Sequence, residues 1–382
     1  MLEKVRGQMA VVVIVHPKSL IILTTYVNVS TMTTTTIKDV AKKAGVSTAT
    51  VSRVLNNSGY FDAETARRVK EAVESLSYRR NVHWERLVRN ESRTVCFMLG
   101  NRESLNSTQV KMLLACERVM AEAGYDIVFS LYRYDPVMKA GNLHLPRLIA
   151  QQGSVDGVIL AGVHHDNFLD ALDKLKLPYV IVGNTYIGRK EKLKQDAIVY
   201  DDVSGCFEAI EYLIRLRHQR IAFVGNTKLP WFARRYEGYQ KAMKKAGLKE
   251  ITVTDDWNVH YIEYGKLAAA ELLRRATTPT AIFCGNDEIA GGVWKALLSR
   301  GVAMPREISL VGFGDREEFS ILEPSLTTIS VFQEKIGEEL ARMLLQKLKN
   351  PGVKLEAKIF PCQLMERNSC SVPLPSLKLV RK

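Results

Sequence analysis

The sequence lacks the features that mark secreted, membrane-spanning and metal-dependent proteins. Its six cysteines are scattered without a CxxC pair and without a histidine at metal-ligand spacing, and most of them lie in apolar runs. This pattern is typical of reduced core cysteines in a cytoplasmic protein, and it predicts no metal site. No apolar run approaches the ~18 residues that a membrane-spanning helix needs, so we expect no contact with a membrane.

The motifs of several common enzyme classes are missing as well. The chain contains no GxxxxGK[ST], HExxH or GxSxG motif, and no GxGxxG motif follows a predicted strand. We therefore predict no catalytic residues and no cofactor, and we expect that the protein is not an enzyme.

What the chain does have is length, apolar residues and a surplus of positive charge. With 382 residues, 46% of them hydrophobic and 25% charged, it can form two or three domains and bury a sizeable core. The formal net charge of +13 favours an acidic polyelectrolyte as partner. A nucleic acid fits this description.

The stretch at residues 36–56, TIKDVAKKAGVSTATVSRVLN, predicts two short helices joined by a tight turn. Apolar residues recur at helical spacing, Gly45 interrupts them, and the spacing then resumes. Thr36 and Asp39 have the spacing of a capping box for the first helix, and Ser47 is placed to cap the second. Both helix starts therefore have a physical cause.

The second predicted helix carries short polar side chains opposite its valines, and it carries one arginine. Small side chains let a helix approach base edges closely, and Arg53 could donate two hydrogen bonds to guanine O6 and N7. The alternative is an ordinary surface helix pair in an all-α domain, and spacing alone does not decide between the two. The residues predicted here to bind DNA are Thr36, Ser47, Thr48, Ala49, Ser52, Arg53 and Asn56.

The wording of residues 36–56 resembles, almost residue for residue, the DNA-binding headpiece of the lactose-repressor/galactose-repressor (LacI-type) family of bacterial transcription regulators. The resemblance implies a helix-turn-helix headpiece at residues 32–77. It also implies a homodimer that binds a palindromic double-stranded operator and responds to a small metabolite. A third helix is expected after Asp62, with an apolar stripe that closes the small core and with basic residues toward solvent or phosphate.

The segment before the headpiece, residues 1–31, starts like a signal peptide, but His16, Pro17 and Lys18 interrupt its apolar run. Export would also carry a DNA-reading helix away from DNA. We expect a non-native or disordered extension, with functional translation starting at Met32.

Residues 78–92 form a basic linker, and the resemblance implies that they are the hinge that folds over the minor groove when two subunits meet. Leu87 stands where the family places the leucine that wedges between base steps. This chain departs from the family pattern at Arg80, Trp84 and Glu85, which puts the usual hinge helix in doubt.

From residue 93 onward, short apolar runs alternate with helical patterns, which predicts parallel sheets covered on both faces. Phrases such as RHQRIAFVG, AIFCGNDEIAGG and ISLVGFGD resemble the family's effector domain, an α/β periplasmic-binding-protein type I fold with two parallel-sheet sub-domains. The expected ligand-binding and dimerisation domain is 93–370, followed by a tail at 371–382. Its sub-domains are expected at about 93–200 with 330–350, and at 201–329 with a last strand at 358–365.

Polar residues directly after apolar strands are candidates for an effector site, because ligands of α/β sheets bind beyond the carboxyl ends of strands. The resemblance implies a cleft there that holds a sugar or a sugar acid, with Arg235 as a planar clamp. The structural alternative is that such residues bond their own backbone or cap the next helix. The candidates are Asn101, Ser104, Asn184, Arg235, His260, Asn286 and Asp315.

Gly314 departs from the family, where an aspartate often stands, and Asp315 could take over that role. Whether the ligand induces release or promotes binding is open, as is its identity. The tail is too short for a leucine heptad repeat, so we expect dimers and not tetramers. The alternative function is a solute-binding protein for transport, which shares the effector fold but would need an export signal and no DNA-reading helices.

Overall fold

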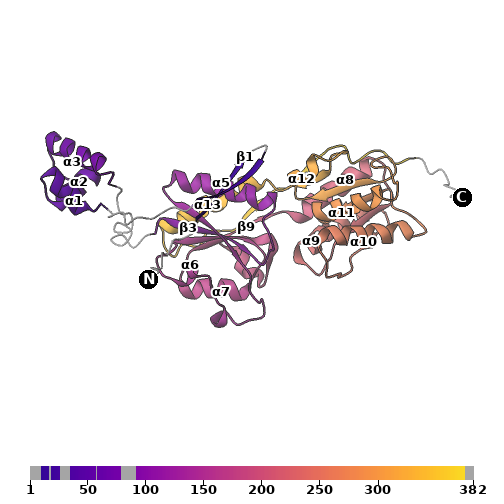
Figure 1. The fold of residues 1–382 in the computed structure, drawn as a ribbon. Helices are drawn as coiled ribbons and strands as arrows, with labels where there is room; N and C mark the ends of the chain where they lie inside the picture. The colour runs from indigo at the N-terminus through magenta and orange to yellow at the C-terminus, as the bar shows by residue number, and fades with distance from the viewer. Residues whose placement is uncertain (1–9, 17–18, 26–34, 57, 79–91, 375–382) are drawn as a thin grey trace, which may run out of the picture. The chain divides into compact units, whose positions relative to one another are not determined.

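The computed structural model describes residues 10–16, 19–25, 35–56, 58–78 and 92–374. The chain divides into two compact units, residues 1–89 and residues 90–382. None of the helices in the described part of the chain has the length and apolar character that crossing a membrane requires. Figure 1 shows the elements of both units.

The first unit contains the predicted three-helix headpiece. Its helices are α1 (Ile37–Ala44), α2 (Thr48–Asn56) and α3 (Ala63–Ser75). The apolar positions that the sequence placed on one face do form a single core, in which Val40, Val51 and Val69 are fully buried. Each of the three helices contributes one of these valines, so none of the helices could bury its apolar face alone.

The predicted caps are confirmed by hydrogen bonds. The backbone N–H of Thr36 donates to Asp39 Oδ2 at 2.8 Å, the N–H of Thr50 donates to Ser47 Oγ at 3.1 Å, and Asp62 caps α3. Gly45 ends α1 with φ +65°, a backbone conformation that favours glycine. Local sequence therefore sets both the start of α2 and its turn from α1.

Part of the N-terminal extension has regular backbone. Strands β1 (Ala10–His16) and β2 (Ser19–Thr25) pair antiparallel. That residues 1–31 are a non-native extension and that translation starts at Met32 remain predictions.

The second unit contains two six-stranded sheets. The first sheet, in spatial order, consists of β15 (Lys358–Phe360), β9 (Ala197–Tyr200), β7 (Tyr179–Val182), β5 (Gly157–Gly162), β3 (Thr94–Gly100) and β4 (Asp126–Tyr132). The second consists of β11 (Ile251–Val253), β10 (Ile221–Val224), β12 (Ala281–Cys284), β13 (Ser309–Phe313), β14 (Thr327–Ser330) and β16 (Gln363–Met365). Only the β14–β16 pair among these strands is antiparallel, which confirms the predicted parallel sheets.

Helices cover both faces of each sheet, as alternation along β3 illustrates. Val95, Phe97 and Leu99 belong to a core with α5 (Ser107–Glu122) and α13 (Gln333–Lys349), whereas Cys96 and Met98 belong to a core with α7 (Asp166–Leu175). In the second sheet, α8 (Asp202–Arg215) and α9 (Pro230–Lys245) cover one face, and α10 (Tyr261–Arg274) and α11 (Asp287–Leu298) cover the other. Shorter elements are α6 (Arg147–Ala150), α12 (Glu317–Ser320), and the two-residue strands β6 (His164–His165) and β8 (Tyr186–Ile187).

The expected division into sub-domains needs one correction. Residues 358–365 do not form a single last strand of the second sub-domain, because β15 joins β9 in the first sheet and only β16 joins β14 in the second. The chain therefore passes once more between the sub-domains at residues 361–362. Each strand is only three residues long, and its sheet is selected by long-range pairing that local sequence does not reveal.

Candidate functional site

The predicted DNA-reading face of α2 is open. Thr48, Ala49 and Arg53 are exposed and Ser52 is partly buried, while Val51 and Val54 on the opposite side are buried. Ser47 and Thr36 are exposed at the helix starts that they cap. The structure therefore places six of the predicted DNA-binding residues around the starts of α1 and α2 and on the free side of α2.

Two further predicted DNA contacts cannot be placed in the same way. Leu87, the predicted wedge, lies outside the described residues, and the side chain of Asn56 does too.

On α3, Arg67 is bound to Glu64 at 2.6 Å and to Glu71 at 2.7 Å, so its guanidinium is already occupied by carboxylates. Lys70 on the same helix is exposed.

In the second unit, the predicted effector residues Asn184 and Arg235 meet at one carboxylate, that of Asp202. Oδ2 of Asp202 accepts from Asn184 Nδ2 at 2.8 Å, and Oδ1 accepts from Arg235 Nε at 2.9 Å. Asn184 also exchanges hydrogen bonds with the backbone of Tyr200, and Arg234 forms a second ion pair with Asp202. This cluster holds the end of β7 against the starts of α8 and α9, where the chain crosses between sub-domains.

Arg235 is buried and its polar contacts are inside the protein. Its Nη1 donates to the carbonyl of Gly285 at 2.5 Å, and its guanidinium lies 3.7 Å from the centre of the Phe313 ring. Burial by itself lowers the pKa of Arg235, but the Asp202 carboxylate outweighs it and the pKa is raised. Asp202 was not among the residues that the sequence suggested, since nothing local indicates that it pairs with a residue 33 positions away.

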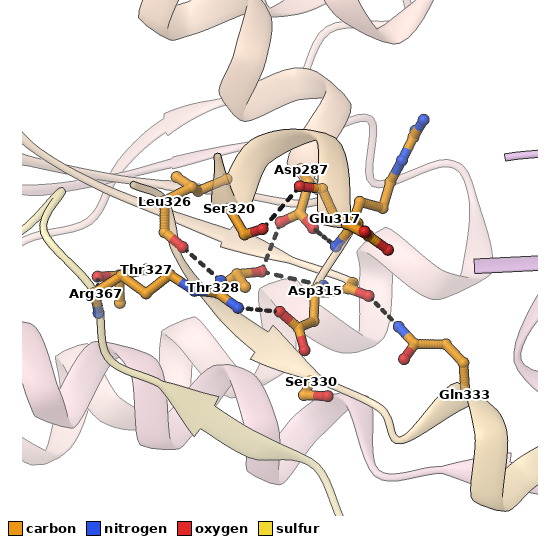
Figure 2. A network of polar contacts seen from close by, with 12 residues as sticks. Asp287, Asp315, Glu317, Ser320, Leu326, Thr327, Thr328, Ser330, Gln333 and Arg367 are labelled. Atoms are coloured by element: carbon orange, nitrogen blue, oxygen red, sulfur yellow. Dashed lines mark hydrogen bonds and ion pairs between the residues drawn. The ribbon is translucent and has the colours of Figure 1, made fainter. Parts of the chain in front are cut away.

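Asn286 and Asp287, which follow β12, have structural partners. Oδ1 of Asn286 accepts from the N–H of Ile289 at 2.8 Å and caps α11, as the structural alternative anticipates. Asp287 is fully buried and accepts from Thr328 Oγ1 at 2.6 Å and from the N–H of Arg316 at 2.8 Å (Figure 2). Burial raises its pKa to about 6.

Gly314 and Asp315 follow β13. The backbone of Gly314 has φ +133°, which side-chain-bearing residues rarely adopt, and its carbonyl accepts from Gln333 Nε2 (Figure 2). This conformation gives a backbone reason for glycine where the family often has aspartate. Asp315 is bound to Arg367 at 2.6 Å, so its carboxylate is also partnered.

The remaining candidates have fewer polar contacts within the protein. Oδ1 of Asn101 accepts from the N–H of Tyr134 at 2.9 Å and joins the ends of β3 and β4. Ser104 is exposed, and His260 is exposed with Nε2 3.8 Å from a Glu103 carboxylate oxygen. The binding roles of all seven candidates remain predictions, although the geometry gives most of them a structural role as well.

Comparison with known proteins fits both units. The family model described as bacterial regulatory proteins, lacI family, matches residues 36–81, and a periplasmic binding protein-like domain model matches residues 210–370. The chain is 30% identical over 345 residues to the HTH-type transcriptional regulator DegA of Bacillus subtilis (strain 168), covering 88% of this chain and 98% of that protein. It is 27% identical over 341 residues to the repressor CytR of Escherichia coli (strain K12), covering 88% and 96%.

Solved structures agree with the sequence relatives. The lac repressor dimer bound to operator and the anti-inducer ONPF matches with a TM-score of 0.73 and 25% identity, covering 88% of this chain and 99% of that one. A complex of the transcriptional regulator CelR with cellobiose matches with a TM-score of 0.62 and 26% identity, over the same shares. These proteins are transcription regulators and not enzymes. With its three-helix headpiece and its pair of parallel-sheet sub-domains, the chain belongs to the LacI family of DNA-binding bacterial transcription regulators.

Proposed function

We propose that this regulator is a cytoplasmic homodimeric repressor that binds a palindromic operator and releases or tightens its hold when a sugar or sugar acid binds between the two sub-domains. The single observation that carries the DNA-binding part is the free face of α2, with Thr48, Ala49 and Arg53 exposed. A helix with such a face fits the major groove, where Arg53 would read a guanine.

Exposed apolar side chains support the dimer. Val110 and Leu114 lie on α5, and Phe129 and Leu131 lie on β4, an edge strand that packs next to α5. Exposed apolar residues on an edge strand invite pairing with another chain, and contiguous apolar patches are typical of interaction sites. A second copy of this chain is the partner that a two-fold symmetric operator requires.

Contacts between the sub-domains support control by a small molecule. Ser107 Oγ donates to Glu318 at 2.6 Å, and Lys111 lies 3.6 Å from Glu317, so the start of α5 is joined to α12 by polar groups at the surface. Exposed polar pairs contribute little to stability and are readily exchanged. A ligand that favours one arrangement of the sub-domains would therefore need little free energy to break these contacts. Ligand binding would change operator affinity, and operator binding would change ligand affinity by the same factor.

The test is selection of genomic fragments by the purified full-length chain, followed by operator-binding titrations with and without a panel of sugars and sugar acids. We expect one or a few palindromic sites, bound by two chains, with an affinity that a panel member changes. Equal binding to random duplex under all conditions would contradict the proposal.

A further inference from the structure

At the junction of the two sub-domains, Arg102 has no acidic partner among the residues that the structure describes. It follows β3 by two residues and is partly buried, and its Nε is buried with no hydrogen-bond acceptor among the described residues. Its guanidinium lies 5.8 Å from the ring of Trp231, which belongs to α9 of the other sub-domain. A buried N–H group of a cation is normally paired, so this one requires an explanation.

Four other arginines beyond the carboxyl ends of these strands do have acidic partners, whereas Arg133, directly after β4, donates to the backbone carbonyls of Arg102 and Glu103. Arg234 and Arg235 share Asp202, Arg316 is bound to Glu288 and Glu318, and Arg367 is bound to Asp315. In the part of the chain that the structure describes, no carboxylate forms an ion pair with Arg102. Its positive charge is therefore available to a ligand.

A second unpaired polar atom lies at the same edge of the first sheet. Gly100 at the end of β3 pairs with Gly162 at the end of β5, and three residues later His165 has a buried Nδ1 that forms no hydrogen bond within the described part of the chain. Adjacent parallel strands bring Arg102 and His165 to the same edge. One offers N–H donors and a charge, and the other offers a ring nitrogen that can accept or donate.

We propose that Arg102 binds an anionic group of the effector, a carboxylate or a phosphate, and that the effector is therefore an acid or a phosphate ester and not a neutral sugar. This inference rests on the proposed function and names its ligand class. A guanidinium matches either oxyanion with two parallel hydrogen bonds. Arg235, the clamp that the sequence suggested, is instead occupied by Asp202 and Gly285.

The position of Arg102 also gives the anion a way to act. Arg102 belongs to the first sub-domain and its guanidinium lies 5.8 Å from the ring centre of Trp231 in the second, so a ligand bound by Arg102 would lie where the sub-domains meet. A ligand at this position has a different affinity for each arrangement of the sub-domains. Such a difference is what a ligand needs in order to change operator affinity.

The test uses the full-length chain and matched probes: glucose with gluconate and glucose 6-phosphate, galactose with galactonate, and ribose with ribose 5-phosphate. Binding is followed by the shift in Tm and by the change in tryptophan fluorescence, with Trp231→Phe identifying the signal of this site. We expect at least one acid or ester to bind about tenfold or more tightly than its neutral parent, because charge-assisted hydrogen bonds are strong. Gluconate and galactonate report a carboxylate, and the esters report a phosphate.

Variants then assign the effect. Arg102→Gln should weaken binding of the anionic probe by about tenfold or more, and Arg102→Lys should weaken it less, since a lysine keeps the charge and loses the fork. Arg133→Gln is the matched control, because Arg133 is an exposed neighbour whose Nε donates to the Arg102 carbonyl. It should change affinity less than about twofold. Operator affinity without ligand should be unchanged in the Arg133→Gln control.

Three results would overturn the inference: tighter binding of a neutral sugar, anion binding that survives Arg102→Gln, or no anionic probe that binds. If a neutral sugar changes operator affinity, the proposed function stands and the anion inference fails. If no operator is found at all, the proposed function itself fails.

Discussion

Asp202 and Arg235 form a buried ion pair, with 2.9 Å between Oδ1 and Nε and side-chain exposures of 0% and 6%. The pair joins the first residue of α8 to the second turn of α9. Charges withdrawn from water need good geometry to be tolerated, and here Asn184, Arg234 and Gly285 complete the hydrogen bonds. Arg235 therefore has a structural role in the second unit.

Removing either member of this pair should destabilise the protein. Asp202→Ala should lower the free energy of unfolding by about 3 to 5 kcal/mol, because it leaves the buried charge of Arg235 unpaired. Arg235→Ala should cost less, because Arg234 still pairs with Asp202. The double variant should lose less than the sum of the two, as measured by urea unfolding in a double-mutant cycle. The matched control is Asp201→Ala, which removes only the cap from Asp201 to Ser204 and should cost about 1 kcal/mol. Additive losses would argue against the pair.

Arg53→Ala should weaken operator binding by about 1 to 3 kcal/mol and relax the preference at one base pair of each half-site, because a bidentate contact to guanine is lost. Binding titrations on operators altered at single positions measure both effects. Arg67→Ala is the control, since Arg67 is already bound to Glu64 and Glu71, and its loss should change operator affinity little. A uniform loss on all sequences would show that Arg53 contacts phosphate and reads no base.

The stability contribution of Asp287 should depend on pH. Burial raises the pKa of Asp287 from 3.8 to about 6. Between these two pH values the carboxyl of Asp287 is protonated in the native state and ionised in the unfolded chain. The contribution is full below about pH 4 and disappears as the pH rises through about 6, a change of about 3 kcal/mol. Asp287→Asn removes this titration, so its stability relative to wild type should improve as the pH rises over that window, as measured by urea unfolding.

The exposed Asp255 provides the control for that series. Asp255→Asn should leave the pH dependence of the unfolding free energy close to that of wild type. If wild type and Asp287→Asn vary with pH in parallel, another group carries the titration.

Leu114→Lys should weaken the proposed dimer, because it places a charge on the exposed apolar face of α5. Analytical ultracentrifugation should show a Kd for dimerisation raised by about tenfold or more, with a parallel loss of operator binding. Val137→Lys is the comparison, since Val137 is also apolar and exposed but lies in a loop after β4. An unchanged Kd in Leu114→Lys would show that the dimer interface does not include Leu114.

The headpiece was predictable in detail because its causes are local. The caps at Thr36, Ser47 and Asp62 act over three residues, and the turn at Gly45 needs only one positive φ. The effector unit was predictable as a class, since its strands and helices alternate. The placement of β15 and β16 in different sheets was not, because three-residue strands are selected by partners far along the chain.

By itself, the sequence determined the helix-turn-helix, its buried valines and its free polar face, because helical periodicity and capping depend on residues at most four positions apart. Only the tertiary structure decided which of Arg102 and Arg235 has a carboxylate partner among the described residues. Arg235 meets Asp202 from 33 positions away, whereas Arg102 meets an indole ring and no carboxylate among the described residues. Charge pairing between distant segments is settled by packing, and packing is what a linear sequence does not display.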